Sequence, residues 1–196
     1  MTPIRYRTLT MVTVLWLVVV AQVSAQDDPL RGGAFVLGGV MGGGFFQGKS
    51  DLDSCNWWGV RAGHRFAPFS GVERVQFGFR AGWEGCVTEQ TGIGRVDLVY
   101  VNVTFTVGVR VARSWLVYWG TGAGMLLGDT TFEDDGEVKP RPSIHLGPGV
   151  MWALGRHLVL DLSLFGLVFE GFDFGSTTSN GSTLGVMPTL MVALQI

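Results

Sequence analysis

The sequence predicts an all-β protein: a transmembrane antiparallel up-and-down β-barrel of about eight strands that follows a cleaved N-terminal signal peptide. Three observations predict it: an apolar leader, long segments in which hydrophobic residues alternate with period two, and a high hydrophobic content with no later helix-like span. Hydrophobic residues make up 47% of the chain and charged residues 15%, against roughly a quarter charged in ordinary globular domains. A chain this apolar needs a surface that lipid can cover.

The first residues have the three parts of a signal peptide. Two arginines precede an apolar run over residues 9–21, and small residues lead up to Ala25. The run is shorter than the roughly 20 residues that a helix needs to cross a bilayer. We therefore expect residues 1–25 to be removed after Ala25, and residues 26–196 to form one outer-membrane β-barrel domain.

Period-two alternation predicts the strands. Over residues 102–111 every odd position is apolar and every even position is small or polar, which is typical of a strand with one apolar face. The alternating segments exceed the usual strand of about 5 or 6 residues and suit membrane strands, which need about 9 to 11. The expected strands are 33–45, 55–66, 73–86, 95–111, 114–127, 141–154, 157–171 and 183–196.

The connections between these strands alternate in length. Short periplasmic turns and longer outer loops are typical of outer-membrane barrels, and an even number of strands leaves both termini at the short-turn end. The short connections are 67–72, 112–113 and 155–156, and the longer polar ones are 46–54, 87–94, 128–140 and 172–182.

The two faces of the strands differ in chemistry. Charged residues fall on the glycine-rich face, which must point into the lumen because a charge facing lipid near the midplane costs about 2 to 4 kcal/mol. Tryptophans fall on the apolar face, several near strand ends, where they predict an aromatic girdle. The expected lumen charge network is Arg61, Arg65, Arg80, Glu84, Arg110 and Asp161, and the expected girdle is Trp58, Trp83, Trp115, Trp119 and Trp152.

The two cysteines lie on adjacent predicted strands at the long-loop end. Disulfides persist in exported proteins, so we favour a Cys55–Cys86 disulfide over two free thiols. If the cysteines face each other directly, the same register sets Arg61 opposite Arg80. It also sets Trp58 opposite Trp83.

Two facing arginines would repel each other and require a partner. We expect Asp161 to be that shared partner, with Glu84, Tyr100, Tyr118 and Asn102 as further candidates. A barrel of eight strands is only wide enough for its own side chains to fill it. A packed lumen is therefore favoured over a conducting pore.

With these features, residues 26–196 resemble the small outer-membrane barrels of the OmpA-like and OmpX-like kind. The resemblance covers the whole mature chain and rests on the strand pattern, with no short motif. It implies a monomeric integral protein of the bacterial outer membrane, inserted by the barrel assembly machinery and in contact with lipid and lipopolysaccharide. The alternating residues 190–196 match the last strand of such barrels, but Ile196 stands where these barrels usually have an aromatic residue.

Other classes of protein fit the sequence less well. A soluble lipocalin-like barrel would turn the glycine-rich face to water with few charges. With 14 Lys and Arg against 16 Asp and Glu, the chain is not basic enough to predict a nucleic-acid partner. No cofactor is expected.

Motifs for catalysis or metal binding are weak. Ser143 and His145 share a strand face, and some small outer-membrane barrels modify lipid A, but nucleophilic catalysis also needs an orienting group. A histidine that lines the lumen is the favoured interpretation. His64 and His157 have no partners at metal-ligand spacing, so no metal site is expected.

Two further segments have simple interpretations. The glycine-rich run 120–124 resembles a nucleotide-binding loop but lies within a strand, and its glycines are expected to leave room for lumenal arginines. The acidic segment 129–137 lacks calcium-loop spacing and is expected to be a solvated outer loop, with weak divalent-ion bridging to lipopolysaccharide as the alternative.

The sequence thus predicts a structural or surface-interaction barrel with a side-chain-filled lumen and extracellular loops. The first alternative is a narrow pore for small solutes. The more distant alternative is a barrel enzyme that modifies lipid A, and no enzymatic activity is expected.

Overall fold

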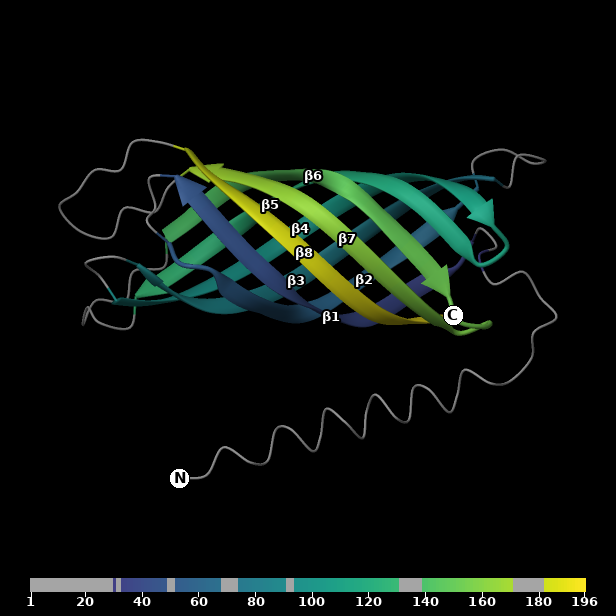
Figure 1. Ribbon diagram of the computed structural model, residues 1–196, viewed down its shortest axis with the longest axis horizontal. Helices are drawn as coiled ribbons and strands as arrows, with labels where there is room; N and C mark the ends of the chain where they lie inside the picture. The colour runs from purple at the N-terminus through teal and green to yellow at the C-terminus, as the bar shows by residue number, and fades with distance from the viewer. Residues whose placement is uncertain are drawn as a thin grey trace, which may run out of the picture.

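A computed structural model describes residues 30, 33–48, 52–67, 74–90, 94–130, 139–170 and 182–196. These residues form one barrel whose strands tilt relative to its long axis (Figure 1). The strands are β1 (Phe35–Gly48), β2 (Cys55–Phe66), β3 (Val75–Gln90), β4 (Gly94–Ala112), β5 (Trp115–Thr130), β6 (Lys139–Ala153), β7 (Leu158–Glu170) and β8 (Ser182–Gln195).

The barrel is closed and antiparallel. Each strand pairs with the next in the chain, and β8 pairs with β1 to complete the ring. Closure leaves no open sheet edge, which is what a strand-built protein needs within hydrocarbon. The ladder is locally interrupted at Pro188 in β8 and at Pro148 in β6, because proline has no N–H to donate.

The two ends of the barrel differ. The C-terminus and the short β4–β5 and β6–β7 turns lie at one end, on the right of Figure 1. We name this the periplasmic end, following the usual orientation of such barrels, and the opposite end the outer end. Among the described residues, no helix is long and apolar enough to cross a membrane.

All eight expected strands are present, and their bounds differ from the expectation by a few residues. The main difference is at the outer end, where β3 continues to Gln90 and β5 to Thr130. Backbone pairing extends there beyond the apolar alternation, with Gln90 opposite Gly94 and Thr130 opposite Val96. In addition, the Asp53 amide donates to the Glu89 carbonyl at 2.9 Å, and the Thr88 hydroxyl donates to the Asp53 carbonyl at 2.7 Å.

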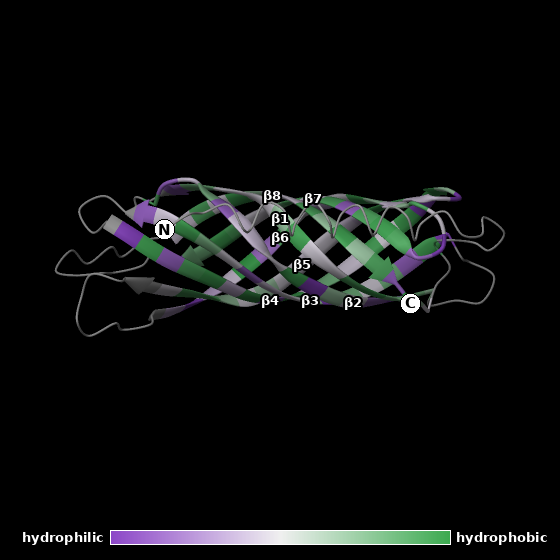
Figure 2. Ribbon diagram, turned by 90° about the horizontal axis from the view of Figure 1, so that it is seen from below, coloured by the Kyte–Doolittle hydropathy of each residue, from purple (hydrophilic) through white to green (hydrophobic). Residues whose placement is uncertain are grey.

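The apolar face is the outer wall of the barrel. Valines, leucines and tryptophans are exposed there, with Ile144 at 61% and Val103 at 52%, whereas the charged residues of the strand interiors are buried. Hydrophobic residues recur along the whole barrel wall (Figure 2). This arrangement suits lipid outside, and it is the reverse of a lipocalin-like barrel.

The register of β2 and β3 differs from the expectation by two residues. Arg61 lies opposite Gly82, and Arg80 lies opposite Gly63, so the predicted Arg61–Arg80 and Trp58–Trp83 pairings are wrong. A shift of two residues preserves which side chains point inward. It also places each arginine across from a glycine, which separates the two positive charges.

The predicted disulfide is present. Cys55 and Cys86 are bonded, with their Cα atoms 6.0 Å apart, within the range that a disulfide spans. The paired register of β2 and β3 begins only at Trp58 opposite Gly85. The error lay in assuming that bonded cysteines must face each other directly.

Candidate functional site: the lumen

An arginine and a glutamate form a bidentate ion pair in the lumen. Arg61 on β2 donates from Nε to Oε1 of Glu84 on β3 at 2.7 Å, and from Nη2 to Oε2 at 3.0 Å. Asn102 on β4 donates to the same carboxylate at 3.3 Å, and Arg61 reaches Oγ1 of Thr189 on β8 at 3.3 Å. Because Glu84 is fully buried, its charge depends on these donors.

A second ion pair crosses the lumen. Nη1 of Arg80 on β3 lies 2.7 Å from Oδ2 of Asp161 on β7. Tyr118 on β5 donates its hydroxyl to Oδ1 of Asp161 at 2.6 Å and accepts from Arg80 at 3.0 Å. The guanidinium also lies 4.6 Å from the centroid of the Tyr118 ring, a favourable cation–π distance. Three strands are linked through the interior in this way.

The expectation that Arg61 and Arg80 share Asp161 is wrong. Asp161 pairs with Arg80, while Arg61 pairs with Glu84 two positions along the neighbouring strand. The two-residue change in register is the reason, because it brings Glu84 diagonally within reach of Arg61. Arg110 lies half-buried at the periplasmic end, where it lines an open pocket.

His145 is held by two hydroxyl groups. Its Nδ1 lies 2.6 Å from the Tyr100 hydroxyl and its Nε2 lies 2.7 Å from Oγ1 of Thr104. Both ring nitrogens therefore have partners, and neither partner is Ser143. The Ser143–His145 pair does not have the contact that a nucleophile and its base require.

An apolar layer of side chains lies in the outer part of the lumen. Trp57, only 1% exposed, contacts the rings of Phe46 and Tyr100 with centroids 6.4 Å away in each case. Phe46 in turn contacts Phe169 at 5.9 Å. The rest of this outer apolar layer is Leu52, Cys55, Cys86, Val96, Leu98, Leu126, Leu167 and Met187.

Sequence reasoning missed this layer because it considered only the charged, hydrogen-bonding and glycine residues of the inward face. Trp58 is assigned to the aromatic girdle, whereas its neighbour Trp57 has no assigned role. The period-two rule does contain the missing signal, since neighbouring residues of a strand point to opposite faces. An outward Trp58 therefore requires an inward Trp57.

A second apolar layer lies nearer the periplasmic end. Leu30 is fully buried there, and the Gln76 side chain donates to its carbonyl oxygen. Beside it, Arg65 donates to the side chain of Gln195. No strand pattern signalled Leu30, because it precedes β1. The other members of this periplasmic apolar layer are Leu116, Tyr118, Met151, Ala153, Val159 and Phe165.

Solved structures with a similar fold are membrane barrels. Ail, the attachment invasion locus protein of Yersinia pestis, in complex with the heparin analogue sucrose octasulfate, aligns with a TM-score of 0.56 and 14% identity, over 84% of this chain and 99% of that one. Neisserial surface protein A aligns with a TM-score of 0.57 and 9% identity, over 85% and 99%. The fold is that of the small eight-stranded outer-membrane barrels. No protein-family model and no curated protein sequence matches the chain.

The expected girdle tryptophans all lie on the outer wall of the barrel. Trp58 and Trp83 contact edge to face toward the outer end, with centroids 5.8 Å apart. Trp115 and Trp152 stack at the periplasmic end, 5.2 Å apart and 8° from parallel. Aromatic residues at two levels are what the two interfaces of a bilayer favour.

The glycine run in β5 makes room for rings rather than for arginines, which corrects the expectation. A Cβ atom at Gly122 would lie 2.6 Å from the His145 ring, and one at Gly124 would lie 2.5 Å from the Tyr100 ring. At Gly120 the nearest atom would belong to Phe165, at 2.9 Å. The interior rings therefore depend on these glycines for space.

Metal-binding geometry is absent from the described part of the chain, where no group of three His, Cys, Asp or Glu side chains converges. His64 stacks on Phe66, and Nδ1 of His157 lies 3.2 Å from the Gln195 carbonyl oxygen. Most of the acidic segment 129–137 lies outside the described residues.

Proposed function

We propose that this chain is a surface-interaction protein of the bacterial outer membrane, in which a packed, non-conducting barrel carries outer loops that contact partners. The observation that carries the proposal is the filling of the lumen at successive levels. An outer apolar layer around Trp57, the two ion pairs, and a periplasmic apolar layer around Leu30 follow one another along the axis. Such an interior suits a rigid anchor better than a path for solutes.

Export and assembly belong to the same proposal. We infer that residues 1–25 are removed after Ala25 and that the barrel assembly machinery inserts the remaining chain as a monomer. The sequence of the leader and the closed barrel support this route. N-terminal sequencing of protein from an outer-membrane fraction should begin at Gln26. A chain that keeps its leader, or that fractionates with the periplasm, would contradict it.

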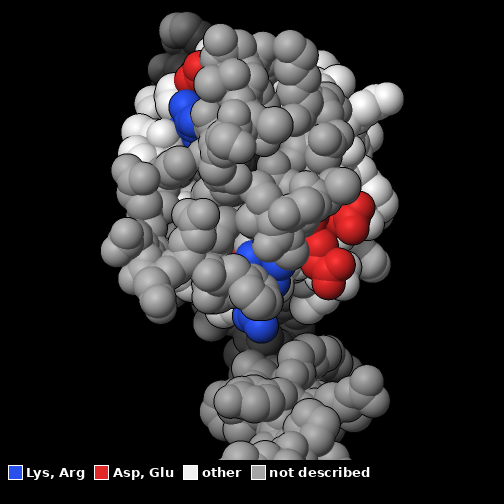
Figure 3. Space-filling view, turned by 90° about the vertical axis from the view of Figure 1, so that its left-hand side faces the viewer, with Lys and Arg blue, Asp and Glu red and all other residues white. Residues whose placement is uncertain are grey.

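The charge of the outer end favours a particular kind of partner. Arg95 pairs with Asp97 at 3.2 Å and Arg141 with Glu170 at 3.4 Å, and Asp53 and Glu89 add further acidic groups. Figure 3 shows charged side chains of both signs around the rim of this end. The sequence of segment 129–137 adds more acid. We infer a partner that is cationic or bridged by divalent cations, such as lipopolysaccharide, rather than a sulfated polyanion like the ligand in the Ail complex.

A pair of binding measurements tests this charge preference. The mature protein in nanodiscs should bind lipopolysaccharide in the presence of Mg²⁺, lose that binding when EDTA is added, and pass through immobilised heparin. Retention on heparin together with Mg²⁺-independent lipopolysaccharide binding would overturn the inferred partner chemistry.

A pore remains the second candidate, because the middle of the lumen is polar. Swelling of liposomes in isotonic solutions of small sugars or amino acids separates the two: a packed barrel gives no swelling above that of empty liposomes. Lipid A modification is a distant third, and mass spectrometry of lipid A from cells with and without the protein tests it directly.

A further inference from the structure

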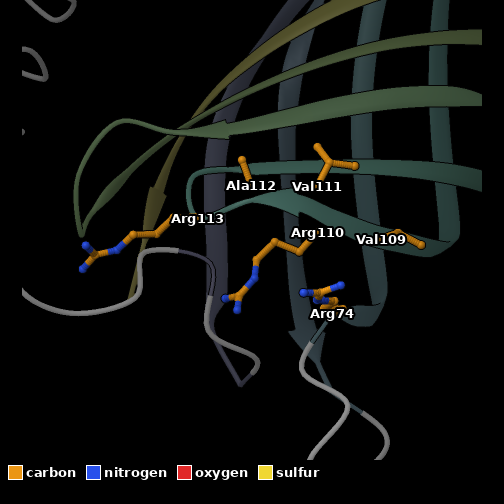
Figure 4. Close-up of a pocket in the computed structure, with 6 residues that line it drawn as sticks. All are labelled: Arg74, Val109, Arg110, Val111, Ala112 and Arg113. Atoms are coloured by element: carbon orange, nitrogen blue, oxygen red, sulfur yellow. The ribbon is translucent and has the colours of Figure 1, made fainter.

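An open pocket of about 600 Å³ lies at the periplasmic end, lined by three arginines and three small apolar residues. Figure 4 shows Arg74, at the start of β3, and Arg110, near the end of β4, extending into the same region, while Arg113 extends from the β4–β5 turn. The backbone brings the first two together, since the Arg110 amide donates to the Arg74 carbonyl at 2.7 Å. The apolar lining is Val109, Val111 and Ala112.

The end of β4 is irregular at this pocket. The register with β5 shifts between Arg110 and Ala112, which marks a β-bulge at Val111. Bulges at barrel rims redirect side chains. Here Val111, 63% exposed on the outer wall, and the half-buried Arg110 both line the pocket.

The pocket lies at the level of the periplasmic aromatic residues. Ala112 pairs with Trp115, whose ring stacks on Trp152. On the other side, Val109 pairs with Val75 of β3. Phe77, two residues farther along β3, stacks on Phe66 with ring centroids 6.0 Å apart. Aromatic residues of this kind lie among lipid headgroups, so the pocket is placed where phosphates of the periplasmic leaflet lie.

The charges around the pocket favour an anion. Among the described side chains, the carboxylates of Glu84 and Asp161 lie in the lumen ion pairs, and the others, on Asp53, Glu89, Asp97 and Glu170, lie toward the outer end. Arg110 and Arg113 make other interactions within the chain, but a guanidinium has five N–H donors and can hold a phosphate alongside another partner.

We propose that this pocket binds the phosphate of an anionic phospholipid of the periplasmic leaflet. Arg74, Arg110 and Arg113 bind the headgroup, and an acyl chain follows Val109 and Val111 along the outer wall. A choline headgroup fits poorly, because its ammonium would approach the arginines. Basic pockets at membrane interfaces bind anionic headgroups in this way.

Native mass spectrometry of the folded mature protein, titrated with phosphatidylglycerol or phosphatidylcholine, tests the proposal. Phosphatidylglycerol should bind more tightly than phosphatidylcholine. Replacing one arginine, as in R110Q, should weaken phosphatidylglycerol binding about fivefold. The triple variant R74Q/R110Q/R113Q should lose the preference, while the corresponding lysine variant should keep most of it. The control R95Q/R141Q, which removes arginines at the outer end, should bind like the wild type. A gel shift on boiling establishes that each variant is folded.

Three results would overturn the proposal. The first is an undiminished preference for phosphatidylglycerol in the folded triple variant, which would place the lipid elsewhere. The second is displacement of the lipid by inorganic phosphate at millimolar concentration, which would indicate a site for a free anion. The acidic residues Asp27, Asp28 and Glu73 lie close in sequence to Leu30 and Arg74. The third result is lipid binding that appears only when all three are neutralised, in D27N/D28N/E73Q, which would mean that the chain's own acidic residues compete for the pocket.

Discussion

Arg80 on β3 and Asp161 on β7 form an ion pair, 2.7 Å between Nη1 and Oδ2, from strands on opposite sides of the barrel. The pair is buried, and Tyr118 hydrogen-bonds to both partners. A buried ion pair of this kind contributes little net stability as a unit, but loss of one partner leaves an uncompensated charge. This asymmetry makes the pair a sensitive probe of whether the lumen is dry and packed.

Replacement of Asp161 by Asn should lower the free energy of unfolding by about 3 to 5 kcal/mol, because Arg80 would remain buried without its carboxylate. The matched control is Glu170→Gln, which breaks the exposed pair with Arg141 and should cost less than about 1 kcal/mol. Urea titrations of protein refolded into lipid vesicles compare the two variants. Small and equal effects would mean that Arg80 is hydrated.

The Arg61–Glu84 pair should show the same asymmetry in a double-mutant cycle. Glu84→Met alone should destabilise the barrel by about 3 to 5 kcal/mol, whereas Arg61→Met combined with Glu84→Met should recover much of that loss, since no buried charge remains. The same urea titrations provide the four free energies. Strictly additive single-mutant effects would show that the two side chains do not depend on each other.

Gly149 makes room for Tyr118. A Cβ atom at Gly149 would lie 2.2 Å from Cζ of the tyrosine ring, so Gly149→Ala should cost about 1 to 3 kcal/mol through overpacking. At Gly39 the nearest atom to an added Cβ is 4.0 Å away, and Gly39→Ala should be neutral or stabilising by about 0.4 to 1 kcal/mol. The temperature at which each variant loses its folded band on a gel ranks the two variants, and equal temperatures would contradict the ring packing.

The Cys55–Cys86 disulfide joins residues separated by 31 positions. In the chain-entropy account, its loss should lower the free energy of unfolding by about 3 to 4 kcal/mol. Alkylation without reductant, followed by mass spectrometry, should label neither cysteine, and Cys55→Ser/Cys86→Ser should refold with the predicted loss. Full labelling of both thiols in the native protein would show that the bond does not form.

Much of the fold could be predicted from local pattern. Period-two alternation depends only on which face of a strand meets lipid, so the eight strands and the inward position of Arg61 or Asp161 followed from the sequence. A shift of two residues leaves that pattern unchanged. The register of β2 and β3, and with it the partner of Arg61, therefore could not be fixed by alternation.

The filling of the lumen was harder to predict for a related reason. Inward positions hold both polar and apolar residues, and which of them meet depends on the tilt and closure of the barrel. Trp57 and Phe46 come from neighbouring strands, whereas Leu30 precedes β1 and packs among residues of β5, β6 and β7. Contacts of this second kind leave no periodic trace in the sequence.

The central claim is that the lumen is closed, and single-channel recording in planar bilayers tests it most directly. The disulfide-bonded mature protein should insert without producing discrete conductance steps. Trp57→Ala/Leu30→Ala, which removes a large side chain from each apolar layer, serves as the comparison. This variant should show brief channel openings if the two layers block the lumen. Stable, ohmic conductance steps from the wild-type protein would contradict the closed lumen and would make the barrel a pore.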